Sequence, residues 1–197
     1  MIVYALLPDK KNKKTFVMCR GNDLEKIGDF DTGKKKIGNW APPGIEWFDD
    51  DGRNLDKYKD PDISYISSDL SSLTVNPRAH DLIAPVVKGA AELLPIPFND
   101  ETWYLLNVFN QVKALDKANS RYKIYSTGEV GWLIKPAFLA DKVPHNKLFK
   151  IPENPARIYF AEHHSGNNEN NFKNIVEKNN LFGIEFVKVW EDQESTG

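Results

Sequence analysis

Short runs of β-branched and aromatic residues, separated by turn-forming residues, recur along the chain and favour a strand-rich fold. Continuous apolar runs are typical of strands that are covered on both faces, whereas strict alternation is typical of half-buried strands. We therefore expect strands at Ile2–Leu7, Thr15–Cys19, Ile45–Phe48, Ile63–Ile66, Thr102–Val108, Tyr122–Tyr125, Trp132–Ile134, Leu148–Ile151, Arg157–Ala161 and Gly183–Trp190.

Some of these runs also indicate how the strands are paired or covered. A lysine-rich turn joins Ile2–Leu7 to Thr15–Cys19, which predicts that the two runs form an opening hairpin. The runs Thr102–Val108, Tyr122–Tyr125 and Trp132–Ile134 are apolar enough to be buried strands.

Two segments carry helix signals. Asn76 suits an N-cap and Pro77 suits the first helical position, and an apolar stripe of helical period follows them. Pro85 interrupts the stripe, because proline inside a helix removes a backbone hydrogen bond. We therefore expect two short helical pieces that end near Leu94–Pro95, and a further short helix near residues 169–179.

These patterns predict an α+β fold: a mixed, mostly antiparallel β-sheet with two or three short helices packed on it, including those near residues 76–94 and 169–179. We expect a strand- and loop-rich N-terminal part over residues 1–69 and a C-terminal α+β module over residues 70–190. Residues 191–197 are expected to form a disordered tail.

The composition excludes several classes of protein. The 197 residues include 26 Lys and Arg against 28 Asp and Glu, so no overall positive field is present to hold a nucleic acid. No apolar run approaches the ~18 residues of a membrane span, and the start of the chain lacks the basic region of a signal peptide. The single Cys19 excludes an intramolecular disulfide. We expect a cytoplasmic protein that binds neither nucleic acid nor membrane.

Two apparent ligand motifs fail on inspection. The stretch Gly28–Lys35 fits the sequence pattern of a phosphate-binding loop except at its last position. Lys35 stands there, where a Ser or Thr must hold magnesium. The stretch Asp49–Asn54 suggests a calcium loop, yet Trp47 and Tyr58 occupy positions that need carboxylates. We therefore expect neither a metal site nor a cofactor.

Candidate catalytic residues are few. Glu162, His163 and His164 follow a strand and leave open a small hydrolase or ligand-binding enzyme, although neighbouring side chains on a strand point to opposite faces. Asp116 and Ser120 lie four residues apart, and a cap or turn explains them.

Charge is unevenly distributed along the chain. The acidic segment, defined as residues 46–62, holds seven acidic residues against three basic ones, and such separation steers a charged partner. This segment also carries aromatic residues, which are enriched at interfaces, although core packing explains them equally well. The predicted partner-binding residues are Glu46, Trp47, Asp49, Asp50, Asp51 and Tyr58.

The C-terminal half contains several spaced elements in a recognisable order. They are Gly89–Ile96, Trp103–Val108, Ala114–Asp116 with Ser120, Leu148–Ile151, Ile158–Ala161 and Asn179–Phe186 with Trp190. Over roughly residues 70–190 this pattern resembles the bacterial polymorphic-toxin immunity proteins of family eleven.

The resemblance implies a cytoplasmic protein that binds and neutralises a cognate toxin. Such a toxin is often a nuclease delivered by a type VI or contact-dependent system. The resemblance implies no catalytic residues, and the shared positions are mainly apolar or turn-forming, so none is assigned to the toxin contact. If the toxin is a basic nuclease, the acidic segment could imitate phosphate charge.

Overall fold

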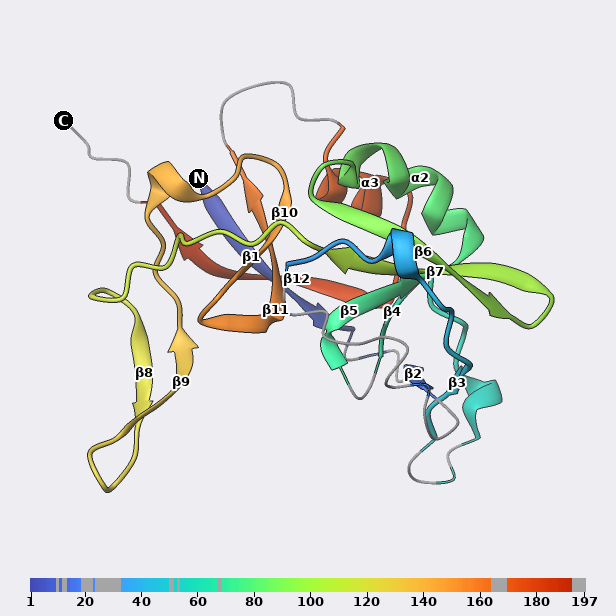
Figure 1. The fold of residues 1–197 in the computed structure, drawn as a ribbon, viewed down its shortest axis with the longest axis horizontal. Coiled ribbons are helices and arrows are strands. Elements are labelled where there is room, and N and C mark those ends of the chain that lie inside the picture. The colour runs from blue at the N-terminus through green and yellow to red at the C-terminus, as the bar shows by residue number, and fades with distance from the viewer. Residues whose placement is uncertain are drawn as a thin grey trace.

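The computed structural model describes residues 1–9, 11, 14–18, 23, 33–49, 52, 54–66, 69–163 and 170–192 (Figure 1). Within them lie three β-sheets, which are mostly antiparallel, and two α-helices of more than one turn. The predicted α+β class is therefore confirmed. Single-turn 3-10 helices form at Ile37–Asn39, Leu55–Lys57 and Ala140–Lys142.

The first strand lies inside a sheet that is otherwise built from the end of the chain. β1 (Ile2–Pro8) pairs antiparallel with β11 (Asn154–Glu162) on one side and with β12 (Ile184–Glu191) on the other. β10 (Leu148–Ile151) pairs with the far side of β11 and completes four strands.

The predicted opening hairpin is wrong. β2 (Phe16–Met18) pairs with β3 (Ile45–Trp47) and, in parallel, with β4 (Ile63–Ile66). β1 instead takes a central position because it is apolar on both faces: Val3 packs into one core and Leu6 into the other. A strand at the edge of a hairpin would leave one of those faces uncovered.

The second sheet has six strands in the order β3-β2-β4-β5-β7-β6. β5 (Asp69–Val75) pairs with β4 and β7 (Glu101–Val108), and β7 pairs along its whole length with β6 (Ala91–Phe98). The β6–β7 hairpin turns at Asn99 and Asp100, whose φ angles of 46° and 53° suit a two-residue turn.

The N-terminus of the first long helix forms as predicted, but its end does not. α2 (Pro77–Val87) begins at Asn76, whose side chain accepts a 2.8 Å hydrogen bond from the Ala79 amide. It is one helix of 11 residues with Pro85 inside, rather than two pieces ending near Leu94–Pro95.

The segment beyond α2 is a strand because of its position in the sheet. Pro95 and Pro97 have no amide hydrogen, and β6 is an edge strand whose outer side needs none. Both prolines are exposed, while Leu94 and Ile96 alternate with them and are buried. The helix predicted near 169–179 is confirmed as α3 (Phe172–Lys178).

Three apolar cores hold these layers together. The largest lies between the two sheets and is closed by α2 and α3, which lie side by side in Figure 1. A second covers the other face of the four-stranded sheet, and a third covers the other face of the six-stranded sheet. No described helix is long and apolar enough to cross a membrane.

A close backbone approach joins the two sheets near α3. Gly183 has a φ of 116°, and a Cβ atom there would collide with the carbonyl oxygen of Ile63. The amide of Ile63 donates a 3.1 Å hydrogen bond to the carbonyl of Phe182. Only glycine therefore fits at this position.

The predicted division at residues 69 and 70 stays a prediction. The pairing of β1 connects the two predicted parts, because both of its partner strands lie beyond residue 150. Glu191 still belongs to β12, and the predicted tail from residue 193 onward lies outside the described residues.

Candidate functional site

The acidic segment is only partly a solvent-facing surface. Glu46 and Asp49 are exposed, Tyr58 is half-buried after a 3-10 turn, and Asp50 and Asp51 lie outside the described residues. Trp47 packs into the third core. Its ring meets those of Phe98 and Trp103 edge-on, at centroid distances of 5.5 and 5.8 Å. Trp47 is therefore engaged in packing, while Glu46 and Asp49 face solvent.

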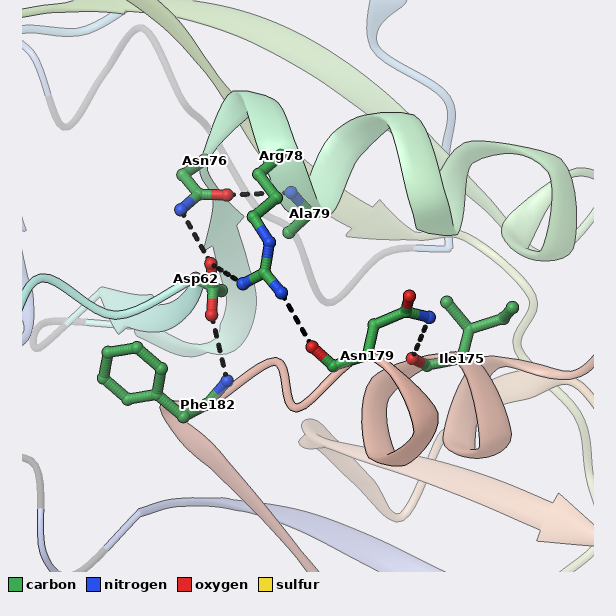
Figure 2. Close-up of polar contacts among 7 residues, drawn as sticks. All are labelled: Asp62, Asn76, Arg78, Ala79, Ile175, Asn179 and Phe182. Carbon is green, nitrogen blue, oxygen red and sulfur yellow. Dashed lines mark hydrogen bonds and ion pairs between the residues drawn. The ribbon is translucent and has the colours of Figure 1, made fainter.

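Asp62, the last acid of that segment, is buried and structural. One carboxylate oxygen accepts 3.0 Å hydrogen bonds from the Asn76 side-chain amide and the Arg78 guanidinium (Figure 2). The other oxygen accepts from the Phe182 amide at 3.3 Å. The carboxylate thus joins the start of β4 to the N-terminus of α2 and to the segment before β12.

Arg78 extends this connection to the end of α3. Its second guanidinium nitrogen donates a 2.7 Å hydrogen bond to the Asn179 carbonyl, and the Asn179 side chain in turn donates to the Ile175 carbonyl at 2.9 Å (Figure 2). The Asp62–Arg78 ion pair thus joins the N-terminus of α2 to the C-terminus of α3. These contacts hold the two helices in place and leave no group available for catalysis by the pair.

Of the residues of the enzyme alternative, Glu162 and His163 are held in structural contacts. Glu162 accepts a 2.9 Å hydrogen bond from the Tyr4 hydroxyl. Burial, and then this hydrogen bond, raise the pKa of Tyr4 to about 12. The His163 ring stacks on that of His145 with centroids 4.3 Å apart, and His164 lies outside the described residues.

Asp116 and Ser120 form a turn, as the sequence predicts. The Asp116 carboxylate accepts hydrogen bonds from the side chain and backbone of Asn119 and from the Ala118 amide. These bonds, that of the Asn119 side chain above all, lower the pKa of Asp116. The Ser120 hydroxyl donates to the Asp116 carbonyl at 2.6 Å and accepts from the Ala137 amide. The Ser120 hydroxyl therefore joins the Asp116 turn to the segment around Ala137 by hydrogen bonds.

No metal site emerges from the part of the chain that the structure describes: no three His, Cys, Asp or Glu side chains lie close enough there to hold an ion. An open hollow of about 690 Å³ lies between the Asp116 turn and the end of β12. Of its charged groups, Lys188 and Glu191 pair with each other at 2.8 Å. The Phe138 and Trp190 rings meet edge-on at its wall.

The third sheet is a two-stranded ribbon that stands apart from the other two. β8 (Arg121–Ile124) and β9 (Val130–Lys135) form what we call the β8–β9 hairpin, residues 121–135, which extends away from the body in Figure 1. Its turn spans residues 125–129, in which the Gly128 amide donates to the Tyr125 carbonyl and Gly128 has a φ of 84°.

The two faces of the β8–β9 hairpin differ in burial. Tyr122 pairs with Leu133, and both side chains pack against the second core. Residues on the opposite face are exposed, although the sequence predicts buried strands here, and that prediction is wrong. Val130 is 67% exposed and Trp132 is 62% exposed. No further strand or helix of the described part of the chain covers this ribbon, so only the face that rests on the body is protected.

Exposed apolar side chains concentrate on this hairpin. The described residues leave seven large hydrophobic side chains exposed, and five of them belong to it: Ile124, Tyr125, Val130, Trp132 and Ile134. Sequence reasoning missed this surface. The usable signal was the period-two spacing of the last three beside a Ser-Thr-Gly turn, with basic residues at both ends.

The fold defines an α+β protein of mostly antiparallel sheets. Within it, residues 96–191 match the model of the Immunity protein family (Imm11), the family that the sequence resembles. The matched segment includes the whole β8–β9 hairpin and the elements of the resemblance from Trp103 onward. The acidic segment lies before it. No curated protein matches the chain.

Proposed function

We propose that this protein binds a cognate bacterial toxin and neutralises it by forming a stoichiometric complex. The observation that carries the proposal is the β8–β9 hairpin, an exposed apolar ribbon inside the segment that matches an immunity family. Exposed apolar clusters rimmed by polar residues mark protein interaction sites. The protein acts in the cytoplasm, on a toxin such as a nuclease delivered by a type VI or contact-dependent system, and performs no chemistry itself.

The acidic segment has a supporting part in this proposal. Glu46 and Asp49 face solvent and carry negative charge, so they steer a basic partner toward the protein. Reversing Asp49, Asp50 and Asp51 to Lys should slow association with a basic toxin by about tenfold at low salt. An unchanged association rate would exclude this segment from the encounter.

The test of the function uses the product of the neighbouring reading frame as the toxin. Expressed alone in a bacterium, that product should stop growth, and coexpression of this protein should restore it. With both proteins purified, inhibition should be complete at one equivalent, in a complex that light scattering shows to be equimolar.

Two outcomes would contradict the proposal. Full protection at far below one equivalent would indicate a catalytic antagonist. Turnover of a substrate that is lost on replacing His163 or His164 would favour the enzyme alternative instead.

A further inference from the structure

We propose that the β8–β9 hairpin, with the hollow at its base, is the part of the protein that docks on the toxin, and that the toxin receives it in an apolar cleft with an acidic rim. This inference rests on the proposed function and names the surface and the partner chemistry for it.

The exposed face of the hairpin has the composition of an interface core. Val130, Trp132 and Ile134 follow one another at period two along β9, so their side chains share the face opposite Leu133, and Ile124, which pairs with Val130 beside a shift in register, is also exposed. Tryptophan is the residue type most enriched among those that dominate binding energies. The six residues of β9 span about 20 Å, which is long enough to enter a cleft.

The aromatic residues near the tip are held in a defined arrangement. The Tyr125 ring meets the Trp132 ring edge-on, with centroids 5.8 Å apart. The Tyr125 ring also lies over Gly131, where a Cβ atom would come within 2.7 Å of it. Side chains that are ordered before binding lose less entropy in the complex, so this packing favours tight binding.

The charge of the hairpin indicates the chemistry of its partner. Arg121, Lys123 and Lys135 are exposed, and within the described residues no ion pair engages them. Glu129 is the one acid of residues 121–135. Basic residues beside an apolar strip are complementary to an acidic rim around an apolar cleft.

Two other occupants fit the surface less well. A second copy of the chain, docked face to face through the same hairpin, would bring equal positive charges together. A single-stranded nucleic acid needs open aromatic faces on which bases stack. Ile124, Val130 and Ile134 are aliphatic, and Trp132 is packed against Tyr125.

The hollow extends the surface toward the body of the protein. A stable interface uses about 20 to 30 residues on each partner, whereas residues 121–135 supply 15. Lys135 belongs both to β9 and to the wall of the hollow, and Trp190 forms part of the same wall. A partner seated on the hairpin therefore also contacts the end of β12.

The experiment compares matched variants in binding to the toxin from the neighbouring reading frame. The hairpin variant is Val130→Ser with Trp132→Ser. Its control is Ile37→Ser with Val187→Ser, which removes exposed apolar side chains elsewhere. A charge variant, Lys123→Glu with Lys135→Glu, tests the acidic rim. Affinity and association rate are measured by surface plasmon resonance, and thermal melting confirms that each variant is folded.

We expect the hairpin variant to bind at least thirtyfold more weakly, because one residue that dominates an interface contributes about that factor or more. The control should bind within about twofold of the wild type. The charge variant should associate about tenfold more slowly at low salt, and the difference should shrink as salt is added.

The outcomes separate the inference from the function on which it rests. If the wild-type protein fails to bind the toxin, the proposed function is wrong. If the wild type and the folded hairpin variant bind equally well, only the inference is wrong. Concentration-dependent dimerisation that the hairpin variant abolishes would assign the surface to a second copy. If the wild type binds a 20-nucleotide single-stranded DNA in a salt-sensitive way and the hairpin variant does not, the surface would be assigned to nucleic acid.

Discussion

The molecule contains two hairpins that each carry a tryptophan on the second strand but have opposite surroundings. In the β6–β7 hairpin, Trp103 is 4% exposed, because β5 pairs with one side of β7 and the third core covers its ring. In the β8–β9 hairpin, Trp132 is 62% exposed, and no further strand among the described residues joins the ribbon. An apolar run thus predicts a strand, but its neighbours determine whether it stabilises the fold or remains available for a partner.

The largest effect that follows from this comparison concerns the two tryptophans. Trp103→Ala should lower the free energy of unfolding by about 3–5 kcal/mol, because it leaves a cavity in the third core. Trp132→Ala should change it by less than about 0.5 kcal/mol, since it removes an exposed side chain. Urea denaturation measures both. Comparable losses would show that Trp132 is packed in solution and would remove the contrast between the hairpins.

The next effect concerns the polar contacts that hold α2 over the buried hairpin. Asp62→Ala removes an acceptor from Asn76, Arg78 and Phe182 and should cost about 2 kcal/mol. Asp81→Ala is the matched control, because Asp81 is 84% exposed in its pair with His80 and should contribute under about 0.5 kcal/mol. Equal costs in urea denaturation would mean that the buried carboxylate does not hold α2 in place.

A smaller effect tests how the exposed hairpin is attached to the body. Leu133 is half-buried and packs against the second core, so Leu133→Ala should cost about 1 kcal/mol, less than a fully buried leucine. The damage should be local. Amide exchange should accelerate over residues 121–135 and stay unchanged in β7. Uniform acceleration over both hairpins would show that the β8–β9 hairpin unfolds together with the core.

The sequence predicts most of the strands and the fold class because apolar period is a local property. Asn76 and Pro77 fix the start of α2 for the same reason, through one side-chain hydrogen bond and one preset φ angle. Pro95 and Pro97 show the limit of local inference. The predicted helical pieces end near Pro95, yet both prolines lie in an edge strand that tolerates proline because its outer side is unpaired within the sheet.

Pairing and burial depend on distant segments, which a local pattern does not contain. The partners of β1 come from the last quarter of the chain, so the opening turn gave no information about them. The candidate surface was missed for the same reason. Ile124, Val130 and Trp132 are as apolar as core residues, and only the arrangement of the sheets leaves them uncovered.

The smallest expected effect on stability comes from a change at the tip of the exposed hairpin. It tests whether the partner needs the ordered packing of the tip or only its amino-acid composition. Gly131→Ala adds one methyl group where the Tyr125 ring now lies, and so pushes that ring away from Trp132. The free energy of unfolding should change by less than about 0.5 kcal/mol, because an exposed ring yields easily and alanine restricts the unfolded chain. Near-ultraviolet circular dichroism should nevertheless change, since it reports the packing of the two rings. Affinity for the toxin should fall by about tenfold through loss of preorganisation, although no contact residue is removed.

Gly128→Ala is an unsuitable control because Gly128 has a positive φ, whereas Thr127→Ala alters the same tip without touching either ring. If Gly131→Ala changes the dichroism but not the affinity, the partner recognises the composition of the hairpin rather than its ordered tip.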